Sequence, residues 1–371
     1  MAAPLNGSRT LFPPTDIRES RSYRGVLGPD HRCYDASESS RTTKRSRTPR
    51  ETGNMQWFSD PGYDYGGGAA EMPREVHGFV LRKPSEIRHH LVTDGVAAAS
   101  AFQRPREATQ RDLARVHAPT LIADLRRARA VARAIEFSAL AEMSDDLVWQ
   151  FVVRPQVLAA GGTYAALLAA ARGEWSINLS GGYHHARRNL SHGFCLINDI
   201  AVGLSRLRHE GTHRRVLIID LDLHQGDGNA TIFADDRDTY TISVHEEGIF
   251  PIPKAGSDLD IGLPSFTGDA DYLGAVEEAL QHARRHFTPE MIVYVAGCDP
   301  YKDDPLGSLQ LTKPGLLARD QRVARFARQQ RCPLVALPAG GYSSDSPSIT
   351  AATFRAIAEI EGLGGQEEAN P

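Results

Sequence analysis

Short apolar runs alternate with amphipathic segments along most of the chain. Each run has the length of a buried strand, and apolar residues recur at helical spacing between the runs, as at Ile197, Ile200, Leu204 and Leu207. We predict strands over residues 175–179, 216–219, 240–244, 291–296 and 333–337. We predict helices over 105–127, 159–172, 197–207, 272–286, 316–330 and 347–361. This alternation favours an α/β fold with a mainly parallel sheet and helices on both faces.

The two ends of the chain differ from this region. Residues 1–54 are dominated by Arg, Ser, Thr, Pro and Gly, and the stretch 39–47 has no apolar period. Such a segment buries too little apolar surface to offset its ordering entropy, so we predict that 1–54 is a disordered basic segment. The alternatives are a basic arm that touches nucleic acid, or a true start at Met55 after a misread leader. Residues 55–363 are predicted to form one domain, followed by a flexible tail over 364–371.

Composition and charge narrow the class of protein. An apolar share of 41% supports a substantial core, and a formal net charge of −4 gives no global reason to expect nucleic-acid binding. No run reaches the ~20 apolar residues of a membrane span, and the N-terminus lacks a signal pattern. The four cysteines have no CxxC spacing, so Cys195 and Cys298 are expected to be reduced core residues. We expect a cytoplasmic protein, or a nuclear one if its source is eukaryotic, without membrane partners.

A cluster of polar side chains follows the apolar run 215–219. Asp220, Asp222 and His224 alternate with leucines, so along a strand their side chains point the same way at its carboxyl end. Two carboxylates and an imidazole in this arrangement form a cradle for a divalent metal. Asp222 and His224 are the first two expected ligands, whereas Asp220 and Asp227 are better placed to orient imidazoles. A helix N-cap role would suit Asp227 alone but does not explain three polar residues spaced by two.

Four other predicted strands end in turns with polar side chains, and the carboxyl ends of parallel strands meet at one edge of a sheet. These turns contribute His184 and His185, Ser243, Asp299, and Tyr342. Asp299 is the expected third metal ligand. A histidine pair alone would fit a surface loop equally well, but the bracketing glycines allow close approach to a ligand. Asp303 and Asp304, in contrast, are expected in an exposed loop.

This set of groups predicts a reaction. One histidine and two carboxylates favour Zn²⁺, with Fe²⁺ or Mn²⁺ as alternatives. Such an ion polarises a carbonyl and lowers the pKa of water toward ~7. His185 would take the proton of the water, and Tyr342 would hydrogen-bond the tetrahedral oxyanion. The sequence therefore predicts a metal-dependent hydrolase that cleaves a linear amide bond.

Five motifs, in this order, resemble the zinc-dependent histone deacetylase family and its bacterial relatives. They are GGYHHA with the later GFC, IDLDLHQGDG, TISVH, AGCD with DPLG, and PAGGY. The resemblance spans most of residues 56–361. It implies the arginase–deacetylase α/β fold, with residues 55–363 as a single histone deacetylase-like catalytic domain.

The resemblance also implies roles for individual residues. The positions that match zinc ligands are Asp222, His224 and Asp299. The positions that match the catalytic groups are His184 with Asp220, His185 with Asp227, and Tyr342. The positions that match a structural potassium site are Asp220, Asp222, His224, Ser243 and Val244.

Substrate contacts follow from the same resemblance. Phe194 and Phe250 match the aromatic pair that walls an acyl-lysine tunnel, and the backbone of Gly193 would contact the lysine chain. The loop 245–250 looks short, which would widen the tunnel mouth, and His192 adds a titratable group near the rim. Leu306 stands where polyamine-selective relatives carry an acid, which argues against a cationic small-molecule substrate.

These residues are consistent with three functional hypotheses. The leading hypothesis is a deacylase that removes acetyl or other acyl groups from N-ε-acyl-lysine in a protein or peptide. The alternative is an amidohydrolase for acetylated polyamines or other small acylated amines. The third is a non-catalytic acyl-lysine binding protein, which would not need both histidines and Tyr342.

Overall fold

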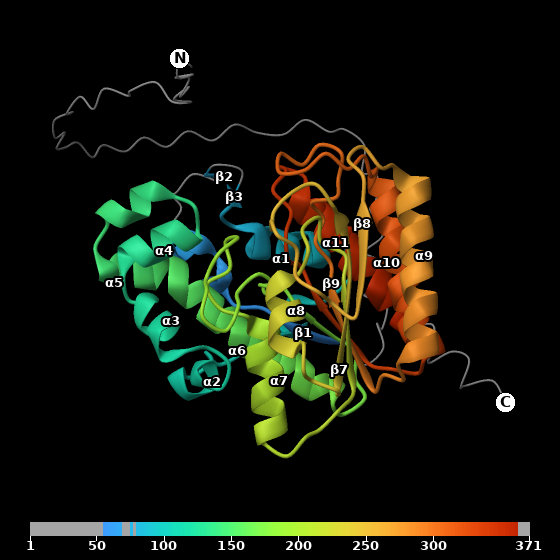
Figure 1. The fold of residues 1–371 in the computed structure, drawn as a ribbon, viewed down its shortest axis with the longest axis horizontal. Coiled ribbons are helices and arrows are strands. Elements are labelled where there is room, and N and C mark those ends of the chain that lie inside the picture. Colours follow the sequence, from blue (N-terminus) through green and yellow to red (C-terminus); the bar gives the residue numbers. More distant parts are fainter. Residues whose placement is uncertain (1–54, 69–74, 77–78, 363–371) are drawn as a thin grey trace, which may run out of the picture. The chain divides into compact units, whose positions relative to one another are not determined.

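The computed structural model describes residues 55–68, 75–76 and 79–362, and these residues build one eight-stranded sheet (Figure 1). Every neighbouring pair of strands in it is parallel. The strand order is β4 (Phe102–Gln103), β1 (Gln56–Phe58), β5 (Ser176–Asn178), β10 (Leu334–Leu337), β9 (Met291–Val295), β6 (Val216–Asp220), β7 (Thr239–Glu246) and β8 (Leu259–Leu263). Separately, β2 (Glu75–Val76) and β3 (Phe79–Val80) pair antiparallel. The predicted parallel α/β architecture is confirmed. The predicted end segments, 1–54 and 364–371, lie outside the described residues.

Helices cover both faces of the sheet. One face packs against α1 (Lys83–Thr93), α9 (Asp269–His286), α10 (Lys313–Gln329) and α11 (Ser346–Gly362). The other packs against α2 (Gln110–Ala114), α3 (Pro119–Asp124), α4 (Ala128–Ala134), α5 (Asp145–Val148), α6 (Arg154–Ala170), α7 (Asp199–His209) and α8 (Asp227–Phe233). In β6, Leu217 and Ile219 face the first layer while Val216 and Ile218 face the second, as the two-residue period of a strand requires.

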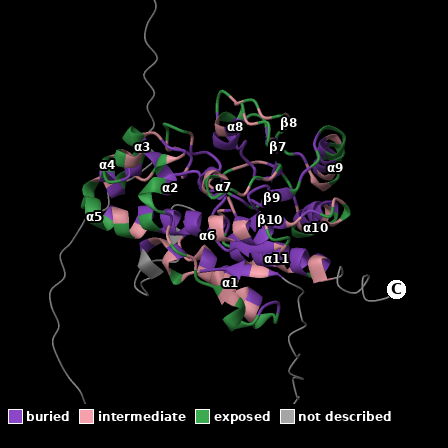
Figure 2. Cartoon of the chain, turned by 90° about the horizontal axis from the view of Figure 1, so that it is seen from below, coloured by how far each residue is buried: buried purple, intermediate pink, exposed green. Residues whose placement is uncertain are grey.

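Burial follows this layering (Figure 2). The central strands β9 and β10 are buried, whereas helices such as α4 and α9 expose their outer sides. Short 3₁₀ turns complete the described elements at Pro61–Tyr63, Tyr65–Gly68, Ala99–Ala101 and Ser138–Glu142. The core therefore forms two apolar layers, one on each side of the sheet.

One continuous helical run is longer and more apolar than the sequence suggested. The helix α5, a π-helical turn (Trp149–Val153) and α6 join without a break, and the run Asp145–Ala170 is long and apolar enough to span a membrane by length and composition. The charged Arg154 interrupts the run in sequence, which is why the combined length was missed. Of its most apolar window, 72% is buried inside the protein, which is the environment of a core helix.

The predicted helix over 105–127 is wrong. The chain forms two short helices there, because Thr109 and Asp112 build a capping box that begins α2, and Pro119 begins α3 after an extended Ala118. The short strands β1 and β4 at one edge were not predicted. The other elements that were not predicted are β2, β3, β8, α1, α4, α5 and α8. The other predicted strands and helices are present with shifted ends. The carboxyl ends of β5, β6, β7, β9 and β10 lead into the turns that carry the predicted site residues.

Candidate active site and metal centre

Three predicted ligands converge at the carboxyl edge of the sheet. Ligand atoms of Asp222, His224 and Asp299 all lie within 4.8 Å of one another, and all three residues are buried. The Nδ1 atom of His224 is 3.4 Å from Asp222 Oδ1 and 3.4 Å from Asp299 Oδ2. Atoms that bind zinc tetrahedrally at about 2.0–2.1 Å lie roughly 3.4 Å apart, so the spacing fits such an ion.

The hydrogen bonds of the two carboxylates support this assignment. Asp222 Oδ2 accepts from the Gly340 N–H at 2.8 Å, and Asp299 Oδ1 accepts from the Leu223 N–H at 3.0 Å. Asp299 Oδ2 is buried, and no described residue donates a well-aligned hydrogen bond to it. Burial and the neighbouring Asp222 raise the pKa of Asp299 to about 7. Because an unsatisfied buried carboxylate is costly, the donor set fits a bound divalent cation.

Glycine is required where the last turn approaches these ligands. A Cβ atom on Gly340 would lie 2.2 Å from Asp299 Oδ2, closer than any non-bonded contact allows. The short Gly340 N–H contact to Asp222 therefore depends on the absence of a side chain.

The two adjacent histidines are held by different carboxylates, as predicted. His184 Nδ1 lies 2.7 Å from Asp220 Oδ2, and His185 Nδ1 lies 2.7 Å from Asp227 Oδ1. Burial lowers the pKa of His184, but Asp220 and Asp222 outweigh it and raise the pKa to about 10. Burial and then His184 lower the pKa of His185 to about 3. Without a bound cation, the environment thus favours the protonated form of His184 and the neutral form of His185.

Asp227 also holds two groups that sequence reasoning did not place there. Its Oδ2 accepts a hydrogen bond from Arg187 Nε at 2.7 Å and lies 3.1 Å from His192 Nε2. His192 Nε2 also lies 2.7 Å from the His185 carbonyl oxygen. The sequence placed His192 near the rim and assigned no role to Arg187. Both follow His185 within a few residues, but their shared partner is over thirty residues away.

The loop that carries Tyr342 is fixed by two residues with no predicted role in the site. Lys83 Nζ, at the start of α1, donates to the carbonyl oxygens of Ala339 at 3.0 Å and Gly340 at 2.8 Å. Asp304 accepts from the backbone N–H of Tyr342 at 2.7 Å. The expectation that Asp304 lies in an exposed loop is wrong, because its side chain is buried beneath the turn whose N–H groups it binds.

Tyr342 faces the site as a neutral phenol. Burial, together with Asp299 and Asp222, raises the pKa of its hydroxyl well above the ordinary value. Its ring centroid is 5.7 Å from that of Phe194. A half-buried neutral phenol beside carboxylates can donate a hydrogen bond to an oxygen atom that gains negative charge.

Three of the four predicted substrate-contacting residues, Gly193, Phe194 and Phe250, lie beside the histidine pair. The Phe250 ring lies 4.9 Å from the His185 ring and 6.2 Å from the His224 ring, between centroids. Gly193 has a φ of +54°, and a Cβ atom there would lie 2.6 Å from the His185 ring. Leu306 is 37% exposed, and its N–H donates to Asp304 Oδ1 at 3.1 Å.

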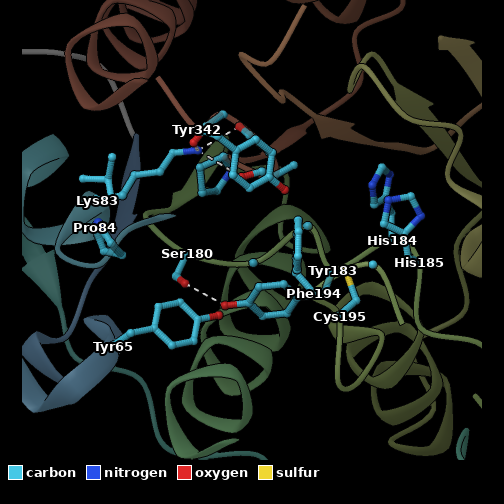
Figure 3. Close-up of a pocket in the computed structure, with 18 of the residues that line it drawn as sticks. Tyr65, Lys83, Pro84, Ser180, Tyr183, His184, His185, Phe194, Cys195 and Tyr342 are labelled. Carbon is cyan, nitrogen blue, oxygen red and sulfur yellow. Dashed lines mark hydrogen bonds between the residues drawn. The ribbon is translucent and has the colours of Figure 1, made fainter. Parts of the chain in front are cut away.

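The pocket beside the histidines is drawn in Figure 3. Its lining joins the turn after β5 to the Tyr342 turn, with Lys83 and Tyr342 on one side and His184, His185 and Cys195 on the other. Tyr65, Ser180 and Tyr183 form its polar floor. Cys195 and Cys298 are buried, and burial raises the pKa of both thiols, as expected for unreactive core residues.

The residues of the predicted potassium site are also adjacent. Asp220 and Ser243 are paired across β6 and β7, and Val244 follows. Ser243 Oγ lies 2.9 Å from His245 Nδ1. The potassium assignment stays a prediction.

Comparison with known proteins gives consistent results. The sequence profile of the histone deacetylase domain matches residues 77–357. Histone deacetylase 2 of Arabidopsis thaliana is 37% identical over 285 residues, which cover 75% of this chain and 72% of that protein.

Two solved structures extend the comparison to three dimensions. A crystal structure of an HDAC homolog complexed with SAHA superposes with a TM-score of 0.64 at 25% identity, over 83% of this chain and 84% of that chain. An acetylpolyamine aminohydrolase from Burkholderia pseudomallei superposes with a TM-score of 0.63 over 82% of this chain and 99% of that one. The second likeness, at 22% identity, concerns the fold alone.

Proposed function

The chain belongs to the histone deacetylase family, and on that premise we propose that it is a zinc-dependent deacylase of N-ε-acyl-lysine side chains. The observation that supports the proposal most directly is the convergence of Asp222, His224 and Asp299 beside two oriented histidines. A neutral Tyr342 adds a donor for the reacting oxygen. Acetyl is the expected acyl group, and longer acyl groups are the alternative.

A divalent cation held by Asp222, His224 and Asp299 would polarise the amide carbonyl and lower the pKa of the attacking water. His185 is neutral and anchored through Nδ1 by Asp227, so its Nε2 atom can take the proton of that water. Tyr342 donates its hydroxyl hydrogen to the carbonyl oxygen as that atom gains negative charge. The proton taken from water is then available to the leaving amine, which departs as free lysine while the acyl group leaves as a carboxylate.

The first test is hydrolysis of a fluorogenic acetyl-lysine peptide by zinc-loaded protein, with the Asp299→Ala and Tyr342→Phe variants. We expect Asp299→Ala to lose both zinc and turnover. Tyr342→Phe should keep zinc and lose roughly 10²–10³-fold in kcat, the usual effect of removing one oxyanion donor. A Tyr342→Phe variant with full turnover would contradict the assigned role. Tight binding of acyl-lysine without any turnover would instead indicate a binding protein.

Acetylated polyamines are the alternative substrate class, and Leu306 is the position that tests it. An apolar, partly exposed residue at this place offers no charge to a polyammonium chain. Leu306→Glu should therefore raise the kcat/KM for acetylpolyamines, with Leu306→Gln as the uncharged control. If polyamine turnover is the same in both variants and the unaltered protein, the interpretation of Leu306 is wrong.

We also propose a structural K⁺ ion at Asp220, Asp222, His224, Ser243 and Val244, which would bind partly through main-chain carbonyls. Replacing K⁺ by a bulky organic cation in the buffer should lower the thermal stability of the protein if this site is occupied.

A further inference from the structure

A surface groove begins at Phe250, the aromatic residue beside the candidate active site. Arg187 and His192 form part of its lining, the end of α8 with Ala234 forms another part, and the segment 251–256 completes it. We call this feature the rim groove. Its lip is apolar, since Leu190 is 44% exposed and Ile252 is 77% exposed.

The rim groove is continuous with the reaction site through shared residues. Phe250 packs against His185 and His224 and also against His192, at 5.4 Å between ring centroids. His192 lines the groove while it contacts Asp227 and the His185 carbonyl oxygen. A peptide whose acylated side chain entered past Phe250 would therefore have its neighbouring residues beside this groove.

The charged groups of the lining have one sign. Arg187 and Lys254 are the charged side chains among the residues that line the groove, and no Asp or Glu is among them, although the whole chain carries a formal net charge of −4. Lys254 is already engaged, because its Nζ donates to the Ile249 carbonyl oxygen at 2.7 Å. Glu247, the acid that raises the pKa of Lys254 most, lies outside the groove lining.

Arg187 has hydrogen-bond donors that are not used within the described part of the protein. Its Nε binds Asp227, and among the described residues neither terminal amino group of its guanidinium has a hydrogen-bond partner. The side chain is 31% exposed and forms part of the groove lining. A guanidinium binds a carboxylate through two donors at once, with a geometry that lysine cannot match.

We propose that the rim groove binds an acidic side chain of the substrate, in a residue next to or near the acyl-lysine, with Arg187 as the anchor. This inference rests on the proposed deacylase function and adds a sequence preference to it. The apolar lip would contact the methylene groups of a glutamate, and the guanidinium would bind its carboxylate.

The test compares peptides rather than removing Arg187, since loss of that side chain would also disturb Asp227. Each peptide carries one acetyl-lysine and, at one of the two positions on either side, Glu, Gln or Lys. The enzyme variants are Ala234→Glu, which places a competing carboxylate in the groove, and Ala234→Gln, which has the same shape without charge. The readout is the ratio of kcat/KM between peptides, so a general change in activity cancels.

At one or more positions we expect kcat/KM to be higher for the Glu peptide than for the Gln peptide, and higher for Gln than for Lys, by roughly fivefold to tenfold. The difference should lie in KM. The preference should shrink between about 50 and about 500 mM salt, disappear in Ala234→Glu and persist in Ala234→Gln. Equal kcat/KM for Glu, Gln and Lys at all four positions would overturn the inference while leaving the deacylase intact. A preference that survives in Ala234→Glu would place the anchor elsewhere and also overturn it. Absence of turnover of every peptide would overturn the proposed function together with the inference.

Discussion

The carboxylate of Asp304 accepts a hydrogen bond from the backbone N–H of Tyr342 at 2.7 Å. The same oxygen accepts from the Ser343 N–H at 3.2 Å, and the second oxygen accepts from the Leu306 N–H at 3.1 Å. A buried carboxylate thus joins the loop at the end of β9 to the turn that carries the phenol. We infer that this contact helps to fix the position of the Tyr342 backbone.

We predict that Asp304→Asn lowers kcat by about tenfold, because one carboxylate oxygen is replaced by an amide group that cannot accept from an N–H. Zinc content should not change, since Asp304 is not a ligand. The matched control is Asp303→Asn at the exposed neighbouring position, which should retain full activity. Steady-state kinetics and metal analysis check both variants. Loss of zinc in parallel with activity would show that Asp304 supports the metal ligands instead.

Lys83 fixes the same turn from the opposite end of the sequence. Its ammonium group lies against two consecutive carbonyl oxygens, those of Ala339 and Gly340. We expect Lys83→Met to reduce kcat by roughly tenfold without loss of zinc, since charged hydrogen bonds of this kind stabilise a loop by about 1.5–3 kcal/mol. Lys83→Arg should restore part of the activity, and Lys302→Met, at an exposed lysine, should have no effect. Full activity in Lys83→Met would rule out a positioning role.

The ligands and the histidine pairs were predictable because each follows an apolar strand. Spacing by two after β6 predicts a common direction for Asp222 and His224, although the strand itself ends at Asp220 and both ligands lie in the turn beyond it. The parallel sheet brings Asp299 to the same edge. Side chains that follow an apolar strand at regular spacing therefore leave a recognisable pattern in the sequence.

Lys83, Asp304 and Arg187 left no such pattern. The first two bind backbone groups of the Tyr342 turn, and a backbone partner has no sequence signature. Lys83 is also 257 residues away from Gly340, so no local spacing relates them. Likewise, the sequence predicts one helix in place of α2 and α3, because the apolar period of the two helices continues across the break at Ala118.

Metal affinity should depend on pH through two of the ligands. In the metal-free protein, burial and Asp222 raise the pKa of Asp299 to about 7. Burial lowers the pKa of His224, but Asp222 and Asp299 outweigh it and raise the pKa to about 9. Both groups must lose a proton to bind zinc, so proton competition weakens as pH rises. We therefore expect the zinc association constant to increase at least about tenfold from about pH 6 to about pH 8.

Competition with a chromophoric chelator measures this dependence, after correction for the chelator's own protonation. Asp299→Asn should bind zinc more weakly and with a shallower pH dependence, because one titrating ligand is gone. An association constant that does not change with pH in the unaltered protein would contradict the assigned ligand protonation.

His117 connects the helical layer to the active-site loop. Its Nδ1 donates to the Arg187 carbonyl oxygen at 3.1 Å, and its Nε2 accepts from the Asn198 N–H at 3.0 Å. Asn198 in turn caps α7 by accepting from the Ala201 N–H. This arrangement needs a neutral imidazole, because a proton on Nε2 would face the Asn198 N–H. Burial accordingly lowers the pKa of His117 to about 4.

The lowered pKa predicts a loss of stability in acid. The unfolded chain takes up a proton at the ordinary histidine pKa of about 6.5, whereas folded His117 resists protonation until about pH 4. The contribution of neutral His117 to the free energy of unfolding is therefore fully present above about pH 6.5 and declines as the pH falls toward 4. At about pH 5 the free energy of unfolding has fallen by roughly 2 kcal/mol. Urea unfolding at about pH 7 and pH 5 measures the change. His117→Gln should lose less stability between these pH values than the unaltered protein, while His209→Gln, at an exposed histidine, should lose as much. An equal loss in His117→Gln and in the unaltered protein would show that other groups cause the acid sensitivity.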